Sequence, residues 1–266
     1  MYWRLFIISV FLIGGAPPVG AQSPTTSNVY IFPLFANGTS SGTSYTSTIK
    51  MTRISGSTSM QCMLTQRNTN AAFTGATGYF YPAYVTDAGF SPAAQSVIIL
   101  DSHSPFWEIL RTNGQSPLQT GYAKLDCPGA VQAQLQVSLS DAKNNKLGEA
   151  TIAPATQGAS FQFLIDRRDG TRLGFSLIND APTGGQFGLV ARDQFNFEVT
   201  RQYDIIQPWS QVSRFVDQML TLPTDFVGTV ELIGVTSGEQ NYAVGLQYTG
   251  TVFTTIQPLV RSTPLP

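Results

Sequence analysis

The sequence predicts an all-β protein made of two tandem antiparallel β-sandwich domains, related by internal duplication and each with one short helix. The first observation is an internal match, because Ile98 to Ile152 aligns without gaps on Ile205 to Leu259, 107 positions later. The second is alternation, since apolar residues recur at every second position of Gln132 to Leu139. The third is turn-forming sequence between such segments. Short alternating strands with turns between them favour an antiparallel sandwich over an α/β fold.

The upstream parts of the two copies align at larger offsets. The offset is 125 for Ile54 to Arg67, matched to Asn179 to Arg192, and 130 for Val29 to Phe35, matched to Ala159 to Ile165. The first copy therefore has two insertions, near residues 37–45 and 68–96, where loops tolerate extra residues. Because an odd slip would turn every side chain of a strand to the other face, the match predicts that Leu139 and Leu246 occupy equivalent core sites.

Residues 1–21 have the layout of a secretory signal peptide. One basic residue, Arg4, precedes an apolar run from Leu5 to Ile13, and the small residues Val19-Gly20-Ala21 stand before Gln22. The apolar run is too short to cross a hydrocarbon core of about 30 Å. We therefore expect cleavage near Gln22, a secreted or periplasmic location, and no membrane span in the mature chain.

The remainder divides into two modules of a size common for β-sandwiches. Module 1 covers residues 22–153 and contains an insert at about 69–95, a linker covers 154–158, and module 2 covers 159–266. The linker, Pro-Ala-Thr-Gln-Gly, is too short for the modules to tumble independently. We expect the two modules to form a short stiff rod.

Alternating segments place the strands. In module 1 they are Val29 to Phe35, Tyr45 to Ile54, Met60 to Gln66, Gln95 to Leu100, Tyr122 to Asp126, Gln132 to Leu139 and Leu147 to Ala153. In module 2 they are Ala159 to Ile165, Thr171 to Ile178, Gln186 to Ala191, Tyr203 to Ile206, Val227 to Ile233, Tyr242 to Tyr248 and Val252 to Val260. Between them, Asn144-Asn145 and Asp169-Gly170 suit hairpins with positive φ, and Pro128-Gly129 suits a type II turn.

One segment in each module departs from alternation. Apolar residues with helical spacing are Val212, Phe215, Val216, Met219 and Leu220, with Ser210 as a cap. The counterpart begins at Pro105 and is followed by Asn113-Gly114, the residues that favour the start and the end of a helix. We predict helical turns over Pro105 to Thr112 and Gln211 to Leu220. Each either packs on the core as an apolar plug or serves as an amphipathic docking helix.

The composition excludes some classes of partner. Charged residues make up 12% of the chain, about half of the usual ~25%, and the formal net charge is −1. Without a basic field the chain is not expected to bind nucleic acid or an anionic membrane surface.

The sequence carries no catalytic or metal-binding motif. His103 is the only histidine, and it lies near Asp101 and Ser104, but a Gly-x-Ser-x-Gly elbow is missing. One histidine and two cysteines show no zinc spacing. Asp166 and Asp169 at a predicted hairpin tip are either solvated turn residues or a weak calcium site. We therefore expect a protein without catalytic residues, metal or cofactor.

Cys62 and Cys127 share the strand phase of core residues, which places both thiols inside module 1. After export the pair can form a disulfide, contributing about 4 kcal/mol in the chain-entropy model. The alternative is two reduced thiols that act as small hydrophobes. We favour the disulfide.

The aromatic insert of module 1 has no counterpart in module 2. Its residues Tyr79, Phe80, Tyr81 and Tyr84 could stack on a sugar ring or anchor a partner protein. The other interpretation is an extra edge strand that covers an apolar face. We treat these aromatic residues as the binding-site hypothesis.

The signal peptide, the 107-residue repeat, strands such as Gln132 to Leu139 and the low charge over Gln22 to Arg261 together resemble secreted bacterial proteins built of tandem immunoglobulin-like or fibronectin-like modules. The chain departs from antibody domains because Trp107 falls in a predicted helix and module 2 has no cysteine pair. The resemblance implies a structural or adhesive role at or outside the cell envelope, with a cell-surface protein or glycan as partner. The alternatives are a carbohydrate- or protein-binding module that uses the aromatic insert, and a secreted hydrolase.

Overall fold

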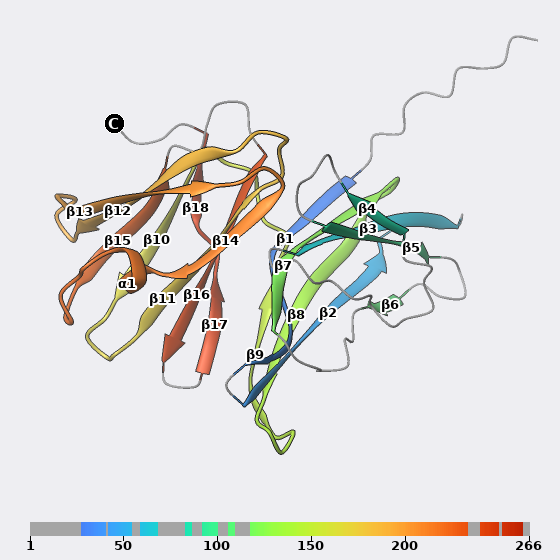
Figure 1. The fold of residues 1–266 in the computed structure, drawn as a ribbon, viewed down its shortest axis with the longest axis horizontal. Helices are drawn as coiled ribbons and strands as arrows, with labels where there is room; N and C mark the ends of the chain where they lie inside the picture. The colour runs from blue at the N-terminus through green and yellow to red at the C-terminus, as the bar shows by residue number, and fades with distance from the viewer. Residues whose placement is uncertain are drawn as a thin grey trace, which may run out of the picture.

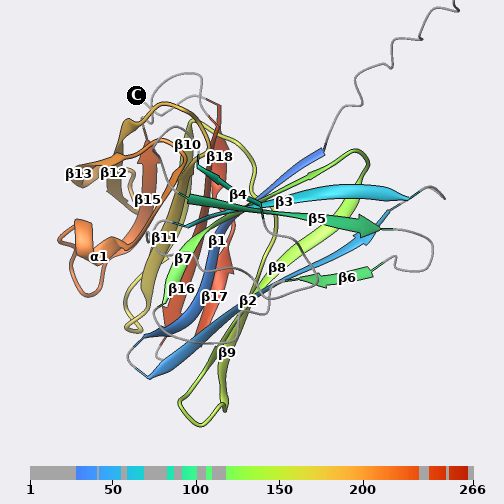
Figure 2. The same ribbon diagram turned by 45° about the vertical axis from the view of Figure 1, so that its right-hand side comes forward.

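A computed structural model shows a chain that is almost entirely antiparallel β-structure, which confirms the predicted fold class (Figures 1 and 2). It describes residues 28–40, 42–54, 59–68, 83–86, 92–100, 106–109, 118–233, 240–249 and 252–262. The strands form two modules, each made of two facing sheets with apolar side chains between them.

Module 1 contains sheet A, in the order β4-β5-β3-β7-β1, and sheet B, in the order β6-β2-β8-β9. The end of β1 also pairs with the start of β2, which joins the two sheets into one folded sheet. The strands are β1 (Asn28–Ser40), β2 (Thr43–Arg53), β3 (Met60–Asn68), β4 (Ala83–Thr86), β5 (Pro92–Leu100), β6 (Phe106–Ile109), β7 (Gln119–Cys127), β8 (Val131–Ser140) and β9 (Lys146–Ile152).

Module 2 contains sheet D, in the order β13-β12-β15-β10-β18, and sheet C, in the order β14-β11-β16-β17. Its elements are β10 (Ser160–Asp166), β11 (Arg172–Asn179), β12 (Gly185–Asp193), β13 (Glu198–Ile206), β14 (Ser210–Phe215), α1 (Val216–Met219), β15 (Val227–Ile233), β16 (Asn241–Thr249), β17 (Val252–Ile256) and β18 (Leu259–Arg261). The order β13-β12-β15-β10 in sheet D matches the order β5-β3-β7-β1 in sheet A. The order β14-β11-β16-β17 in sheet C matches the order β6-β2-β8-β9 in sheet B.

A pair of glycines shows how closely the two modules correspond. A Cβ atom on Gly121 would lie 1.9 Å from the Arg67 carbonyl oxygen, and one on Gly228 would lie 2.0 Å from the Arg192 carbonyl oxygen. Neither strand could approach its neighbour this closely with any other residue. Gly121 and Gly228 are related by the offset of 107, and Arg67 and Arg192 by the offset of 125, so the same close contact between two strands occurs in both modules.

The offset of 107 does not hold in every strand. Ile98 pairs with Cys62, whereas the partner of Phe187, which matches Cys62 at the offset of 125, is Asp204. Ile98 therefore corresponds to Asp204 and not to Ile205, so the gap-free match is wrong by one residue in this strand.

The faces of β16 also differ from the prediction. Ala243 packs in the module 2 core and Gly245 lies under the Phe163 ring, whereas Val244 and Leu246 belong to the apolar cluster of module 1. Leu139 and Leu246 are both buried, but the prediction that they occupy equivalent sites is wrong. Relative to the offset of 107, the inner and outer faces of β16 are therefore exchanged with those of β8.

The predicted helices are mostly strand. Residues 106–109 form β6, which pairs with β2, so the helix over Pro105 to Thr112 is wrong where the structure describes it. Of the helix over Gln211 to Leu220, only α1 is helical, because Ser210–Phe215 is hydrogen-bonded to β11 along the edge of sheet C. Tertiary pairing has overridden the local helical spacing. The hairpin expectations are confirmed, with φ of 65° at Asn144 and 70° at Gly170.

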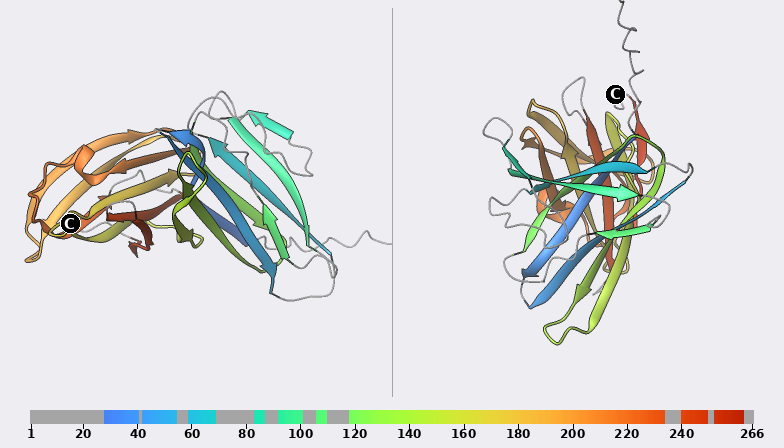
Figure 3. Two further views of the ribbon diagram at one scale, coloured as in Figure 1. Left: turned by 90° about the horizontal axis from the view of Figure 1, so that it is seen from below. Right: turned by 90° about the vertical axis from the view of Figure 1, so that its right-hand side faces the viewer.

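The modules do not lie end to end. Figure 3 shows a bent molecule, in which module 2 packs at an angle against module 1 and the two modules do not form a straight rod. The outer face of sheet C, the face directed away from the module 2 core, packs against module 1, with Val244, Leu246 and Phe253 in the shared cluster. The prediction of a rod is therefore wrong, although the short linker does hold the modules together.

Candidate functional site

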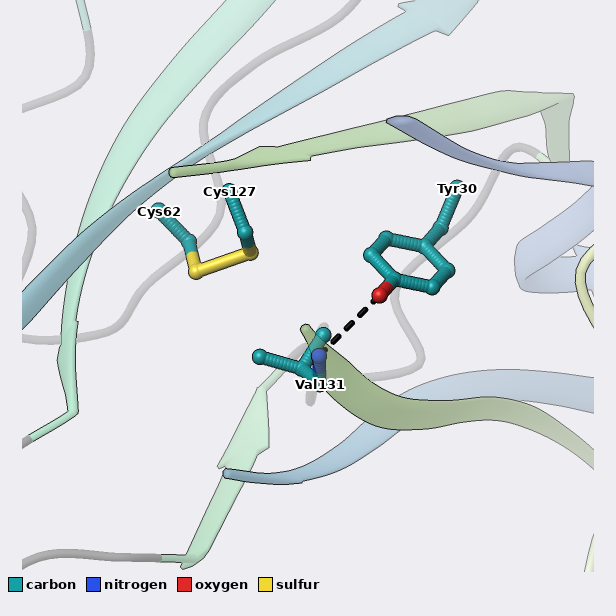
Figure 4. Close-up of a disulfide and its surroundings, with 4 residues drawn as sticks. All are labelled: Tyr30, Cys62, Cys127 and Val131. Atoms are coloured by element: carbon teal, nitrogen blue, oxygen red, sulfur yellow. Dashed lines mark hydrogen bonds between the residues drawn. A yellow bond between two sulfur atoms is a disulfide. The ribbon is translucent and has the colours of Figure 1, made fainter. Parts of the chain in front are cut away.

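The two cysteines are joined by a disulfide between neighbouring strands of sheet A (Figure 4). Cys62 on β3 and Cys127 on β7 are buried, with their Cα atoms 4.3 Å apart. Beside them, the Val131 amide donates a hydrogen bond of 3.0 Å to the Tyr30 hydroxyl, which ties β8 to β1. Because the disulfide lies within one sheet, it differs from the bridge between sheets in antibody domains. Its place in the core is that of a scaffold element.

The aromatic residues predicted to bind a ligand are mostly outside the described residues. Tyr79, Phe80 and Tyr81 fall there, as does His103. Tyr84 lies on β4, which pairs with β5 and forms the edge of sheet A. The insert thus contributes an edge strand, as the second interpretation of the insert expected.

Asp166, one of the two acidic residues considered for a weak calcium site, is bonded to a neighbouring arginine. Both oxygens of Asp166 accept hydrogen bonds from Arg168, at 3.0 Å from Nε and 2.6 Å from Nη2. These bonds hold the pKa of Asp166 at about 2. Across the described ranges, no group of three or more His, Cys, Asp or Glu side chains could hold a metal ion.

The most concentrated polar cluster lies between the two modules, and it centres on Asp180. This residue follows β11 in module 2 and is only 1% exposed. Its Oδ1 accepts a hydrogen bond of 2.6 Å from the Tyr122 hydroxyl, and its Oδ2 lies 2.7 Å from Lys124 Nζ. Tyr122 and Lys124 are on β7 of module 1, so one buried carboxylate binds a neutral and a charged donor of the other module. Charge-assisted hydrogen bonds of this kind are the strong ones in proteins.

A second cation reaches the same carboxylate. Arg67 Nε on β3 lies 4.0 Å from Asp180 Oδ1, and the Arg67 guanidinium lies 4.6 Å from the centre of the Trp209 ring. Trp209 has a φ of 50°, which turns the chain between β13 and β14. Burial, with the nearby Asp180 carboxylate, raises the pKa of Tyr242 above its ordinary value. Two cations, of which Lys124 is partly exposed, thus meet one buried anion.

Neutral contacts extend the interface. Ser176 Oγ and Gln211 Nε2 of sheet C donate hydrogen bonds of 2.6 and 2.8 Å to the Pro33 carbonyl in β1. At the other end, Thr255 Oγ1 donates to the Thr151 carbonyl at 2.8 Å. Module 1 therefore contacts three separate parts of sheet C.

The linker is bonded to both modules. The Ala155 amide donates to the Ile31 carbonyl at 2.8 Å, and the Gly158 amide donates to the Asn241 carbonyl at 3.1 Å. Gln157 forms a single β-bridge with Tyr242. These bonds fix the connection itself, so the angle between the modules is defined by the interface and by the linker together.

The cluster around Asp180 was missed at the sequence level. Its one local signal is the alternation on β7, where Tyr122 and Lys124 point away from the core side chains Ala123 and Leu125. A large buried Tyr on the outer face of a sheet requires something to cover it.

No protein-family model, curated protein or solved structure matches the chain. Within the described ranges no helix is long and apolar enough to cross a membrane. The arrangement of the residues is therefore the basis for a functional proposal.

Proposed function

We propose that the chain is an exported, non-catalytic structural or adhesive protein of the cell envelope or its exterior, in which two β-sandwich modules act as one rigid element. The observation that carries this proposal is the buried carboxylate of Asp180, bonded to Tyr122 and Lys124 across the module interface. A charge that is removed from water and bonded to donors of the other module penalises any opening of the interface. The alternative of an enzyme has less support, because the cluster lies in a closed contact and not in a cleft.

The test is the spread of distances between the modules. Lys143 and Gln194 lie in exposed hairpin turns of modules 1 and 2. Spin labels on Lys143→Cys and Gln194→Cys in the full chain should give one narrow distance distribution. Labelling is specific because the chain's only two cysteines are bonded to each other.

A variant sharpens this test. Asp180→Asn should broaden the distribution, because the amide cannot hold the Lys124 ammonium as the carboxylate does. Asp217→Asn serves as the control, since its ion pair with Arg172 lies within module 2 and is partly exposed. A broad distribution in the unaltered chain would overturn the proposal of a rigid element, and reproducible turnover of a glycan or peptide substrate would overturn the non-catalytic role.

A further inference from the structure

Two phenylalanines project into solvent from a well-ordered turn between β12 and β13. Phe195 and Phe197 are each 70% exposed. Hydrogen bonds to Asp193 hold the turn in place. Its Oδ1 accepts hydrogen bonds of 2.9 Å from the amides of both phenylalanines, and its amide donates to the Phe197 carbonyl at 2.9 Å. Asn196 supplies the positive φ, 67°, that closes it. The aromatic rings are therefore presented on a rigid support.

The turn between β8 and β9 shows that this geometry needs no aromatic residue. There Asp141 Oδ1 accepts hydrogen bonds of 2.8 Å from the amides of Lys143 and Asn145, and the Asp141 amide donates to the Asn145 carbonyl at 2.9 Å. Asn144 has a φ of 65°. The bonds of the main-chain amides match in the two turns, but one presents Lys and Asn, with the Asn145 side chain also bonded to Asp141, where the other presents two Phe side chains. The turn therefore does not explain the phenylalanines.

The apolar surface continues from the turn along β13. Val199, Tyr203 and Ile205 alternate along this strand on the outer face of sheet D, and they are 46–61% exposed. The Tyr203 ring lies over Gly188 of the neighbouring strand, where a Cβ atom would be 3.0 Å from the ring. Large apolar side chains that line one face of one strand are a common mark of a protein contact.

β13 is also the edge of sheet D (Figure 1). The Ile205 amide donates a hydrogen bond of 2.8 Å to the Asp204 carboxylate, and the Tyr203 carbonyl accepts one of 3.4 Å from the Gln202 side chain. These local bonds indicate that the main-chain groups of Tyr203 and Ile205 point away from β12, and alternation extends this to Arg201. The register shift between Ala191 and Arg192 ends the alternation before Phe197, whose carbonyl is bonded to β12. An edge of this kind can pair with another strand.

We propose that β13 pairs with β13 of a second copy of this chain, antiparallel about a twofold axis at Gln202, so that sheet D continues across a dimer. In this register Val199 lies opposite Ile205 of the second copy, and Arg201 lies opposite its Tyr203. Arg201 and Tyr203, whose main-chain groups point outward, then face one another as hydrogen-bonded pairs.

Charge disfavours one neighbouring register. A twofold axis at Arg201 would place two guanidinium groups opposite each other, which is destabilising in a strand pair. With the axis at Gln202, each Arg201 lies opposite Tyr203 of the second copy and keeps the ion pair with Glu198 of its own chain. A self-complementary patch of this type is what a twofold dimer requires.

A hollow beside the edge strengthens the choice. It has a volume of about 360 Å³ and is lined by residues of β13, β14 and α1, among them Asp204, Arg214 and Met219. The incoming strand would lie along this hollow and cover it. The free chain leaves that space open to solvent.

The first test is the mass of the full chain in solution as its concentration is raised. Sedimentation should show a monomer passing to a dimer. Ile205→Lys should shift the midpoint at least tenfold to higher concentration, because it sets a charge against Val199 of the second copy. Leu259→Lys is the matched control, since Leu259 is 59% exposed on the opposite edge of the same sheet, and it should leave the midpoint unchanged.

The double variant Phe195→Lys/Phe197→Asn, which copies the other turn, should weaken association and leave unfolding unchanged. A chain that stays monomeric up to about 200 µM, well above the micromolar range of specific dimers, would overturn the proposal. So would an Ile205→Lys variant that associates as the unaltered chain does.

The second test fixes the register and does not depend on those variants. Gln202→Cys places two thiols at the twofold axis, where Cα atoms of facing strands lie within the ~4.4–6.8 Å range of disulfides. Mild oxidation should give a covalent dimer, whereas Thr200→Cys, which faces Asp204 of the second copy, should give much less. Equal yields from the two variants would contradict the register.

Discussion

Replacing Asp180 by Asn should weaken the whole molecule, because this one carboxylate holds the two modules together. The substitution keeps the shape but removes the charge that faces Lys124 Nζ at 2.7 Å and the Tyr122 hydroxyl at 2.6 Å. A hydrogen bond to a charged group contributes about 1.5–3 kcal/mol, and breaking a buried pair costs about 3–5 kcal/mol.

The Lys124 side chain is 27% exposed, so water recovers part of that loss. We therefore expect the free energy of unfolding to fall by about 3 kcal/mol, at the lower end of that range. Urea unfolding followed by intrinsic fluorescence measures it. The comparison is Asp217→Asn, whose exposed pair with Arg172 should contribute less than about 1 kcal/mol.

A double-mutant cycle isolates the pair. Lys124→Met removes the cation and keeps most of the side-chain volume, so the combination with Asp180→Asn should lose less than the sum of the two single changes. If Asp180→Asn lay within about 0.5 kcal/mol of the Asp217→Asn control, the idea that the buried charge holds the interface would be wrong.

Three further outcomes can be measured. Gly121→Ala and Gly228→Ala should each destabilise the chain by about 3 kcal/mol or more, because the new Cβ atoms would overlap carbonyl oxygens, and thermal unfolding would show equal losses in the two modules. Reduction of the Cys62–Cys127 bond should lower stability by about 4 kcal/mol in denaturant titrations with and without reductant, and an unchanged midpoint would contradict its structural role. Glu231 is buried and neither carboxylate oxygen has a hydrogen-bond partner among the described residues, so Glu231→Gln should raise stability by about 1 kcal/mol; a loss would mean that the charge is satisfied.

Alternation predicted most of the strands because a half-buried strand has to place apolar residues at every second position. The same signal could not tell which surface covers an apolar face. Val244 and Leu246 look like core residues of module 2, yet they pack against module 1. A face buried by its own sheet partner and a face buried by another module have the same sequence pattern.

The helix expectation failed for a related reason. Val212 and Val216 have helical spacing, but a strand followed by one helical turn buries them equally well. The capping contact, in which the Phe215 amide donates to Gln218 Oε1 at 2.9 Å, begins only at the end of β14. Pairing with β11 decided where the strand stops.

The Asp180 cluster had little local signature, because the alternation on β7 marks Tyr122 and Lys124 but not their partner. Its partners Tyr122 and Lys124 lie 58 and 56 positions away in the chain. A single aspartate after a strand is ordinary, and only the approach of another module makes it unusual. A site whose residues are far apart in the sequence can be predicted only after the fold is known.

The shared apolar cluster has a consequence for how the chain acquires its structure during synthesis. Module 1 leaves the ribosome first, but the cluster around its core includes Val244, Leu246 and Phe253, which are made close to the end of the chain. Until those residues emerge, part of the first module has no cover, and exposed apolar surface of that kind favours aggregation. The two modules are therefore expected to complete their folding as one unit, because β16 and β17 cover part of the first module as well as completing the second.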